Sequence, residues 1–148
     1  MTDAESQPGP FLSDLNARSR RHAIFEDDGD TAYLYLTGPD SLAPVAYVWV
    51  YNRARASAES PAAHARGHCS SAPFAWATSR DFSINPAHRQ WSLSWSEDGE
   101  SVSLLENARP VACIVQAGRG RYSRSLVQSG PRGSPWSDAD YAEAFEVI

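Results

Sequence analysis

Two adjacent strand-like stretches constrain the fold more than any other feature of the chain. They lie in residues 31–52, TAYLYLTGPDSLAPVAYVWVYN, where a glycine and two prolines separate 31–37 from 45–51. Successive side chains of a strand point to opposite faces, so one face of the pair is aliphatic and the other is aromatic. The aliphatic residues are Ala32, Leu34, Leu36, Ala46, Val48 and Val50, and the aromatic residues are Tyr33, Tyr35, Tyr47, Trp49 and Tyr51. A sheet that is apolar on both faces is normally covered on both, so we expect a layered fold.

Further strands are predicted on both sides of this pair. The Asp-Gly pair at 28–29 suits a tight hairpin turn, because glycine accepts a positive φ. Residues 90–96 alternate large apolar residues with serines, so the large side chains are expected inward and the serines outward. The inward residues are Trp91, Leu93 and Trp95, and the outward residues are Ser92, Ser94 and Ser96. The additional predicted strands are 21–26, 90–96, 101–106 and 110–116.

The beginning of the chain differs from this strand-rich region. Residues 1–20 are predicted to be a mostly disordered tail, because the first ten residues are polar and contain two prolines. A short helical turn around Phe11, Leu12 and Leu15 is the most order that we expect there. Residues 21–148 form the predicted domain, which is long enough to bury a core without disulfide bonds.

A C-terminal helix is predicted from residue 137 onward. Ser137, with Asp140 three residues later, resembles a capping box, and Tyr141, Phe145 and Ile148 form an apolar stripe. The predicted fold class is therefore α+β: an antiparallel, meander-based sheet or half-open barrel with a C-terminal helix packed on one face. We expect this helix to cover most of the aromatic face, because each enclosed aromatic side chain buries about 150–250 Å² and monomers rarely expose so large an apolar patch.

The sequence also contains a weak internal echo. Residues 28–31 (DGDT), followed by PVA at 44–46, parallel residues 98–101 (DGES), followed by PVA at 110–112. Two similar three-stranded meanders are one interpretation of this echo, and chance similarity of turn chemistry is the other.

The same motifs carry a resemblance to a known family. The segments FEDDGDT (25–31) with two following tyrosines, WSEDG (95–99), LL (104–105), PVA (110–112) and YSR (122–124) resemble the signature of a bacterial family of small proteins of unknown function. The resemblance spans roughly residues 22–126. Ala32 stands where the family has glycine, and the 52–72 loop is longer than expected. The resemblance implies a small bacterial protein and supplies no activity.

Two groups of residues are candidates for a binding surface. The aromatic face could stack against bases, a sugar ring or the side chains of a partner, or it could be covered by the protein itself. The arginine- and glycine-rich loop at 117–136 could bind phosphate or single-stranded nucleic acid, or serve as a hydrated connector. The candidate binding residues are Tyr33, Tyr35, Tyr47, Trp49, Tyr51, Arg119, Arg121, Tyr122 and Arg124.

No motif of a catalytic or metal site is recognisable. His64, His68 and Cys69 come nearest to a zinc site, but no second pair of ligands accompanies them. Cys69 beside a histidine lacks the orienting acid and oxyanion donors that a nucleophile needs. The acidic turns 26–30 and 97–100 do not follow the EF-hand spacing. We therefore predict no metal and no cofactor, and the sequence favours a non-enzymatic protein while leaving catalytic activity open.

The overall charge narrows the choice of partner. A net charge of −5 over 148 residues disfavours nucleic acid. No apolar run reaches the length of a signal peptide or a membrane span, so a soluble, cytoplasmic protein is expected. The favoured function is a small non-enzymatic protein that binds another protein, with toxin neutralisation of the immunity type as one concrete version. The alternative is a small enzyme or ligand-binding domain with an aromatic-lined pocket beside Tyr33, Trp49 and Tyr122.

Overall fold

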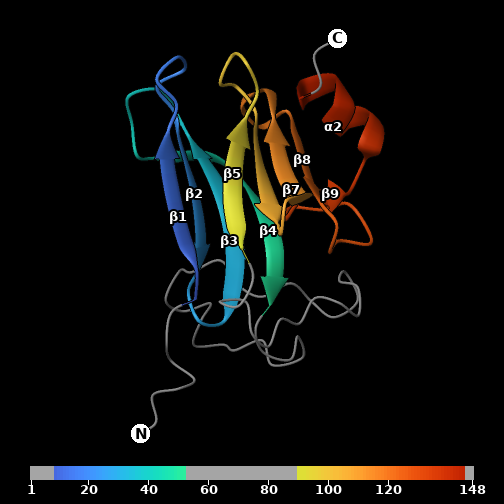
Figure 1. The fold of residues 1–148 in the computed structure, drawn as a ribbon. Helices are drawn as coiled ribbons and strands as arrows, with labels where there is room; N and C mark the ends of the chain where they lie inside the picture. The colour runs from blue at the N-terminus through green and yellow to red at the C-terminus, as the bar shows by residue number, and fades with distance from the viewer. Residues whose placement is uncertain (1–8, 53–89, 146–148) are drawn as a thin grey trace, which may run out of the picture.

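The computed structural model describes residues 9–52 and 90–145. These residues form two β-sheets that face each other, with an α-helix beside the second sheet (Figure 1). The first sheet contains, in spatial order, β1 (Phe11–Leu15), β2 (His22–Asp27), β3 (Thr31–Thr37) and β4 (Pro44–Asn52). The second contains β5 (Trp91–Trp95), β6 (Val102–Glu106), β7 (Arg109–Val115), β8 (Gly120–Ser123) and β9 (Ser134–Pro135), and the helix is α2 (Asp138–Phe145). The predicted α+β class, with antiparallel strands and a C-terminal helix, is confirmed.

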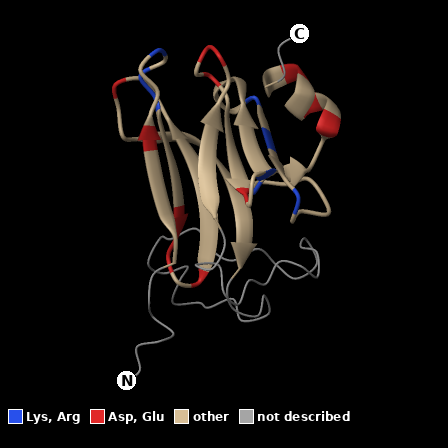
Figure 2. Cartoon of the chain, viewed as in Figure 1, with Lys and Arg blue, Asp and Glu red and all other residues tan. Residues whose placement is uncertain are grey.

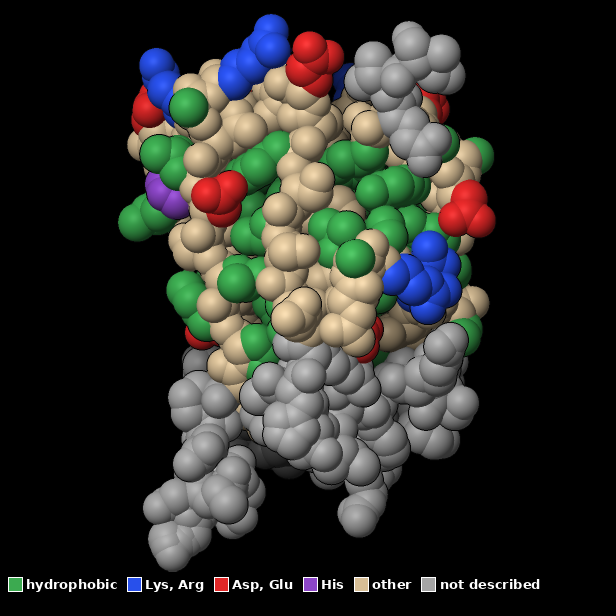
Figure 3. Space-filling view, viewed as in Figure 1, with side chains coloured by type: hydrophobic (Ala, Val, Ile, Leu, Met, Phe, Trp, Pro, Cys, Tyr) green, Lys and Arg blue, Asp and Glu red, His purple; other side chains and the backbone are tan. Residues whose placement is uncertain are grey.

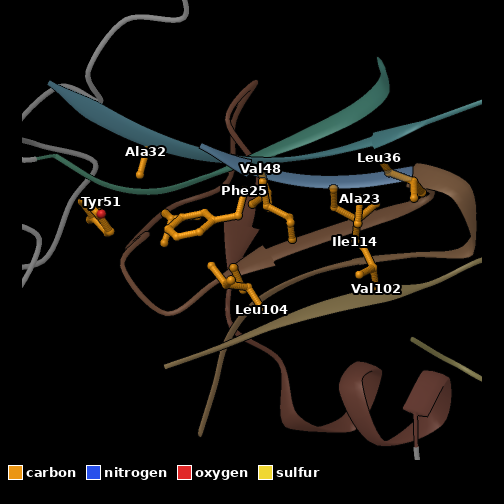
Figure 4. Close-up of a cluster of buried hydrophobic side chains, with 12 residues drawn as sticks. Ala23, Phe25, Ala32, Leu36, Val48, Tyr51, Val102, Leu104 and Ile114 are labelled. Carbon is orange, nitrogen blue, oxygen red and sulfur yellow. The ribbon is translucent and has the colours of Figure 1, made fainter. Parts of the chain in front are cut away.

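The hydrophobic core lies between the two sheets (Figure 4). Phe25, Leu36 and Val48 point inward from the first sheet and are fully buried. Leu104 and Ile114 approach them from the second sheet and are also fully buried. The aliphatic face predicted from residues 31–52 is therefore the inner face of the first sheet.

The two halves of the chain repeat one connectivity. Strands β2–β3–β4 and strands β5–β6–β7 are both antiparallel meanders with neighbouring strands in sequence order. The first hairpin of each meander turns at a glycine with positive φ, 99° for Gly29 and 75° for Gly99. An aspartate just before each glycine accepts backbone N–H groups of its own turn, since Asp28 accepts from Thr31 and Asp98 accepts from Glu100. The structure therefore agrees with the two-meander interpretation of the internal echo.

A β-bulge changes the facing of one predicted aromatic residue. The pairing of β3 with β4 shifts between Ala32 and Tyr33, so that Ala32 pairs with Tyr51 while Tyr33 pairs with Trp49. Val50 is the extra residue of the bulge. The shift reverses the alternation, and Tyr51 joins Ala32 in the core instead of the aromatic face. The prediction for Tyr51 was therefore wrong, because strict alternation does not anticipate a bulge.

Residues 11–15 form a strand, which corrects the expected tail with its helical turn. β1 pairs antiparallel with β2, and Leu12, opposite Phe25, packs against the core. Gly9 and Pro10 also belong to this arrangement, because the Gly9 amide donates to the Asp27 carbonyl and the Asp27 amide donates to the Pro10 carbonyl. The spacing of the apolar residues fitted a helical turn, but pairing with β2 satisfies the backbone and buries Leu12.

The alternation predicted for β5 is confirmed along the strand and fails at its end. Trp91 and Trp95 are half-buried against the core, while Ser92 and Ser94 are exposed. Ser96 is buried, contrary to the prediction. Its hydroxyl donates to the Asp98 carboxylate at 2.8 Å and accepts the Ser101 amide at 3.0 Å. Because β5 ends at Trp95, the strand alternation does not extend to Ser96.

Ser137 is confirmed as the N-cap of α2, but the two hydrogen bonds of its side chain are not the reciprocal pair of a capping box, in which Asp140 would accept the Ser137 backbone N–H. The Asp140 amide donates to the Ser137 hydroxyl oxygen at 3.2 Å, and that hydroxyl donates to the Asp140 carboxylate at 2.7 Å. In α2, Tyr141 and Phe145 stack with a ring distance of 4.7 Å, and Trp136 contacts Tyr141. Ile148 of the predicted stripe lies outside the described residues.

Candidate functional site

Four of the predicted aromatic residues gather on the outer face of the first sheet. Trp49 and Tyr33 are buried, whereas Tyr35 and Tyr47 are half-buried. The Tyr33 ring lies 6.0 Å from the Tyr35 ring and 5.7 Å from the Tyr47 ring, so the three tyrosines are in contact. The aromatic ladder predicted from the sequence therefore forms without Tyr51.

The segment between β8 and β9 covers one end of this ladder. Leu126 is buried against Tyr33 and Trp49, and the Trp49 amide donates to the Arg132 carbonyl at 3.1 Å. Arg121 holds the same edge, because its guanidinium donates to the Tyr47 carbonyl at 2.8 Å and lies 5.5 Å from the centre of the Tyr47 ring. The ladder is thus covered by a loop that follows the edge of β4.

The prediction that the C-terminal helix covers the ladder was wrong. Helix α2 packs beside β7 of the second sheet, where Asp140 lies near Cys113. Its apolar residues Tyr141 and Phe145 contact each other and Trp136. The sequence shows that the stripe needs a partner, but it does not show which of the two sheets the chain reaches after β9.

Trp49 is held from inside the protein by a buried polar network. Its indole Nε1 donates to the Thr31 hydroxyl at 3.1 Å and to the Asn52 side-chain oxygen at 3.0 Å. All three side chains are buried, and a buried indole N–H needs such partners. Trp49 therefore fixes the end of β4 against β3 and offers no surface to a partner.

Tyr51 occupies a second buried polar site, inside the sandwich. Its hydroxyl donates to the Asp27 carboxylate at 2.5 Å, and its ring lies 5.8 Å from that of Trp91. Asp27 also accepts the Gly29 amide at 2.8 Å, so one carboxylate ties the hairpin turn to β4.

The predicted basic candidates are dispersed instead of clustered. Arg124 donates to the Pro110 carbonyl at 2.6 Å and lies 4.4 Å from the centre of the Trp136 ring. Arg121 points to β4, as described above, and Arg119 is exposed near α2. Two of the three guanidinium groups are thus engaged within the fold, and the three do not converge on one anion site.

Tyr122 lies in a shallow groove between β8 and α2. The groove has a volume of about 200 Å³ and is also lined by Arg119, Asp140 and Glu143. Burial raises the pKa of the Tyr122 hydroxyl, and the neighbouring carboxylate of Asp140 raises it further. Tyr122 pairs with Cys113 on the outer side of the second sheet, so it is separated from Tyr33 and Trp49. Within residues 9–52 and 90–145, the three aromatic residues of the expected pocket are therefore not brought together.

Cys113 is a buried residue without the features of a nucleophile. It is fully buried, and burial raises the pKa of its thiol to about 12. A nucleophilic cysteine needs a lowered pKa, because the thiolate is the reactive form. Cys113 therefore serves as a small hydrophobic residue of the packed sheet.

The part of the outer face that the loop leaves uncovered extends towards β1. The register places Ser13, Ile24, Tyr35 and Tyr47 in one row across the four strands. Phe11 and Leu15 flank this row on β1 and are 60% and 53% exposed. We name this surface the open face; its residues are Phe11, Leu15, Ile24, Tyr35 and Tyr47. Phe11, Leu15 and Ile24 were not among the predicted binding residues, because the apolar residues of 11–15 do not alternate with polar ones and gave no strand signal.

Neither the similarity of the chain to known proteins nor its histidine and cysteine residues identifies another functional site. Comparison of the chain with protein-family models, with curated proteins and with solved structures finds no match. Within residues 9–52 and 90–145, no group of three potential metal ligands comes together and no helix has the length and apolar character that a membrane span requires. His64, His68 and Cys69 lie outside the described residues, as does most of the 52–72 loop.

Proposed function

We propose that this chain is a small non-enzymatic protein that binds another protein through the open face of its first sheet. The observation that carries the proposal is the row of half-buried side chains, Ile24, Tyr35 and Tyr47, beside the exposed Phe11 and Leu15. Aromatic side chains are enriched in protein interfaces, and an apolar patch with a polar rim is typical of such a surface. The buried Tyr33 and Trp49 lie beside the row on the same face, and the Tyr33 ring contacts those of Tyr35 and Tyr47.

The site geometry supports a protein partner more than a small ligand. A small-molecule site is usually a concave pocket that encloses its ligand. The open face lies on the outside of a sheet, and the groove beside Tyr122 is shallow and polar. Nucleic acid is a poorer candidate, since two of the candidate arginines are engaged within the fold and the net charge is −5.

Toxin neutralisation is the concrete version of this function that we propose. A small acidic protein that covers a basic active-site surface inhibits an enzyme without any chemistry of its own, and opposite charge accelerates the encounter. The bacterial setting rests on the resemblance of the motifs at 25–31 and 95–99.

The experiment compares three forms of the full chain as baits in extracts of the native host. Ile24→Arg places a charge in the centre of the open face, and Ser92→Arg places the same charge on the exposed side of β5. A partner of the open face is enriched by wild type and by Ser92→Arg and lost with Ile24→Arg. Calorimetry with the purified partner should then show at least tenfold weaker binding for Ile24→Arg, a difference of about 1.4 kcal/mol.

Two results would contradict the proposal. Equal enrichment by all three baits, with melting curves showing that they are folded, would exclude the open face as the binding surface. For the toxin-neutralising version, co-expression with the captured partner must relieve its growth inhibition. If Ile24→Arg relieves the growth inhibition as well as wild type does, toxin neutralisation through the open face is excluded.

A further inference from the structure

β1 lies at one edge of the first sheet, and its outer side is unpaired among the described residues. β1 pairs with β2 on one side, and no other described strand pairs with it on the other. The Asn16 amide donates to the Arg21 carbonyl and the Asp27 amide donates to the Pro10 carbonyl, so the even-numbered residues bond to β2. In an antiparallel pair this bonding alternates along the strand. The N–H and C=O groups of Phe11, Ser13 and Leu15 therefore point to the open edge.

This edge carries few of the side chains that normally protect a strand from association: its one charge, Asp14, lies on the inner side and accepts the Trp95 indole N–H. Natural edge strands carry charges, prolines or bulges that prevent pairing with another chain. β5, at the edge of the second sheet, exposes Ser92 and Ser94, whereas β1 exposes Phe11 and Leu15. In Figure 3 hydrophobic side chains reach the surface along the left edge of the molecule, where Figure 1 places β1.

We propose that β1 pairs with β1 of a second copy of this chain, antiparallel and about a two-fold axis at Ser13. This register brings Ser13 opposite Ser13 of the other copy and Phe11 opposite Leu15. All three pairs join residues whose backbone groups point outward, which gives about six hydrogen bonds between the chains. The exposed Phe11 of each copy then packs on the exposed Leu15 of the other, so the strand is complementary to itself.

The charges near the two ends of β1 have opposite signs, as an antiparallel pairing of two β1 strands requires for attraction between the copies. The β1–β2 connection carries Arg20, which is ion-paired with Asp40, and Arg18, which donates to the Glu97 carbonyl and makes no ion pair within the described residues. The β2–β3 turn at the opposite end of the sheet is acidic (Figure 2). Glu26, opposite Phe11, is exposed and makes no ion pair within the described residues. A two-fold axis across an antiparallel pair of strands places the connection of one copy beside Glu26 of the other. Attraction between these groups favours the proposed register over a parallel one.

The dimer does not depend on the proposed function, but it would enlarge the surface available for it. The two first sheets would become one sheet of eight strands, and their open faces would lie on the same side of it. Loss of dimerisation by Ser13→Pro, whose residue is not one of the open-face side chains, with binding of the partner retained, would therefore separate the two proposals.

Sedimentation equilibrium of the full chain over a series of micromolar concentrations tests the dimer. Wild type should associate in a concentration-dependent manner. Ser13→Pro removes one outward N–H without touching the bonds to β2, and Leu15→Arg places a charge against Phe11 of the other copy. Each should weaken the dimer at least tenfold, while Val127→Arg, at a residue that is 51% exposed, should not. Melting curves check that the variants are folded.

A cysteine at the two-fold axis tests the register. Opposed residues of a hydrogen-bonded antiparallel pair have Cα atoms about 5.5 Å apart, within the range that a disulfide spans. In a Cys69→Ser background, Ser13→Cys should oxidise to a linked dimer and Val127→Cys should not. Three results would overturn the proposal. Wild type could stay monomeric, the dimer could survive both Ser13→Pro and Leu15→Arg, or only Val127→Cys could form the linked dimer.

Discussion

The hydroxyl of Tyr51 donates a hydrogen bond to the buried carboxylate of Asp27 at 2.5 Å, and the two residues lie 24 positions apart in the chain. This contact exists because the bulge in β4 turns Tyr51 into the core, where Asp27 sits at the end of β2. It joins the first hairpin turn to the last strand of the same sheet.

Tyr51→Phe should therefore destabilise the protein by about 1.5–3 kcal/mol, the range for a hydrogen bond to a charged group. The variant keeps the ring but leaves the Asp27 carboxylate without this donor. Denaturant unfolding measures the difference. Tyr141→Phe, at a tyrosine on α2, should change stability by less than about 0.5 kcal/mol. Equal losses in both variants would show that the Tyr51–Asp27 contact adds nothing specific.

Leu126 and Val127 provide a matched test of what covers the aromatic ladder. Leu126 is buried against Tyr33 and Trp49, whereas Val127, the next residue, is half exposed. Leu126→Ala should cost about 2–4 kcal/mol, as expected for a truncated core leucine, and should increase binding of a hydrophobic dye. Val127→Ala should have little effect on either measurement. If the two variants behave alike, the 124–133 segment does not cover the ladder.

The contact between Trp95 and Asp14 links the edges of the two sheets. The indole Nε1 of Trp95 donates to the Asp14 carboxylate at 2.8 Å, and the ring packs against the core. Trp95→Ala should cost about 3 kcal/mol, because the residue is half-buried and not fully enclosed. A double-mutant cycle with Asp14→Ala should give a coupling of about 0.5–1.5 kcal/mol. A coupling near zero would mean that this hydrogen bond does not stabilise the sandwich.

Cys113 should report on the packing of α2. In a Cys69→Ser background, native protein should react slowly with a disulfide reagent at pH 8, because the thiol is buried and its pKa is about 12. Removal of residues 137–148 should accelerate the reaction and leave dye binding at the aromatic ladder unchanged. Rapid labelling before truncation would show that the helix does not shield this thiol.

The raised pKa of Cys113 also predicts an alkaline loss of stability. The folded thiol keeps its proton up to about pH 12, whereas the unfolded thiol loses it near its ordinary value of 9.0. Between these values the folded state binds more protons than the unfolded state, so the free energy of unfolding falls as pH rises. Cys113→Ala should flatten this part of the stability curve. An identical slope for both proteins would contradict the assignment.

The sequence alone determined the local features of this protein. Alternation identified β3 and β4, because their side chains must point to two faces whatever surrounds them. The hairpin at Gly29 and the N-cap at Ser137 were predictable for the same reason, since each depends on atoms only a few residues apart. The echo between the two meanders was also visible in the printed sequence.

Only the tertiary structure decided what each face contacts. The path after β8 brings Leu126 to the ladder and α2 to the second sheet, and no short-range pattern encodes that choice. The bulge that sends Tyr51 inward depends on the pairing of β3 with β4, and the strand at 11–15 depends on a partner strand that buries Leu12. Local propensity is weak compared with long-range burial and backbone pairing, so these contacts override it.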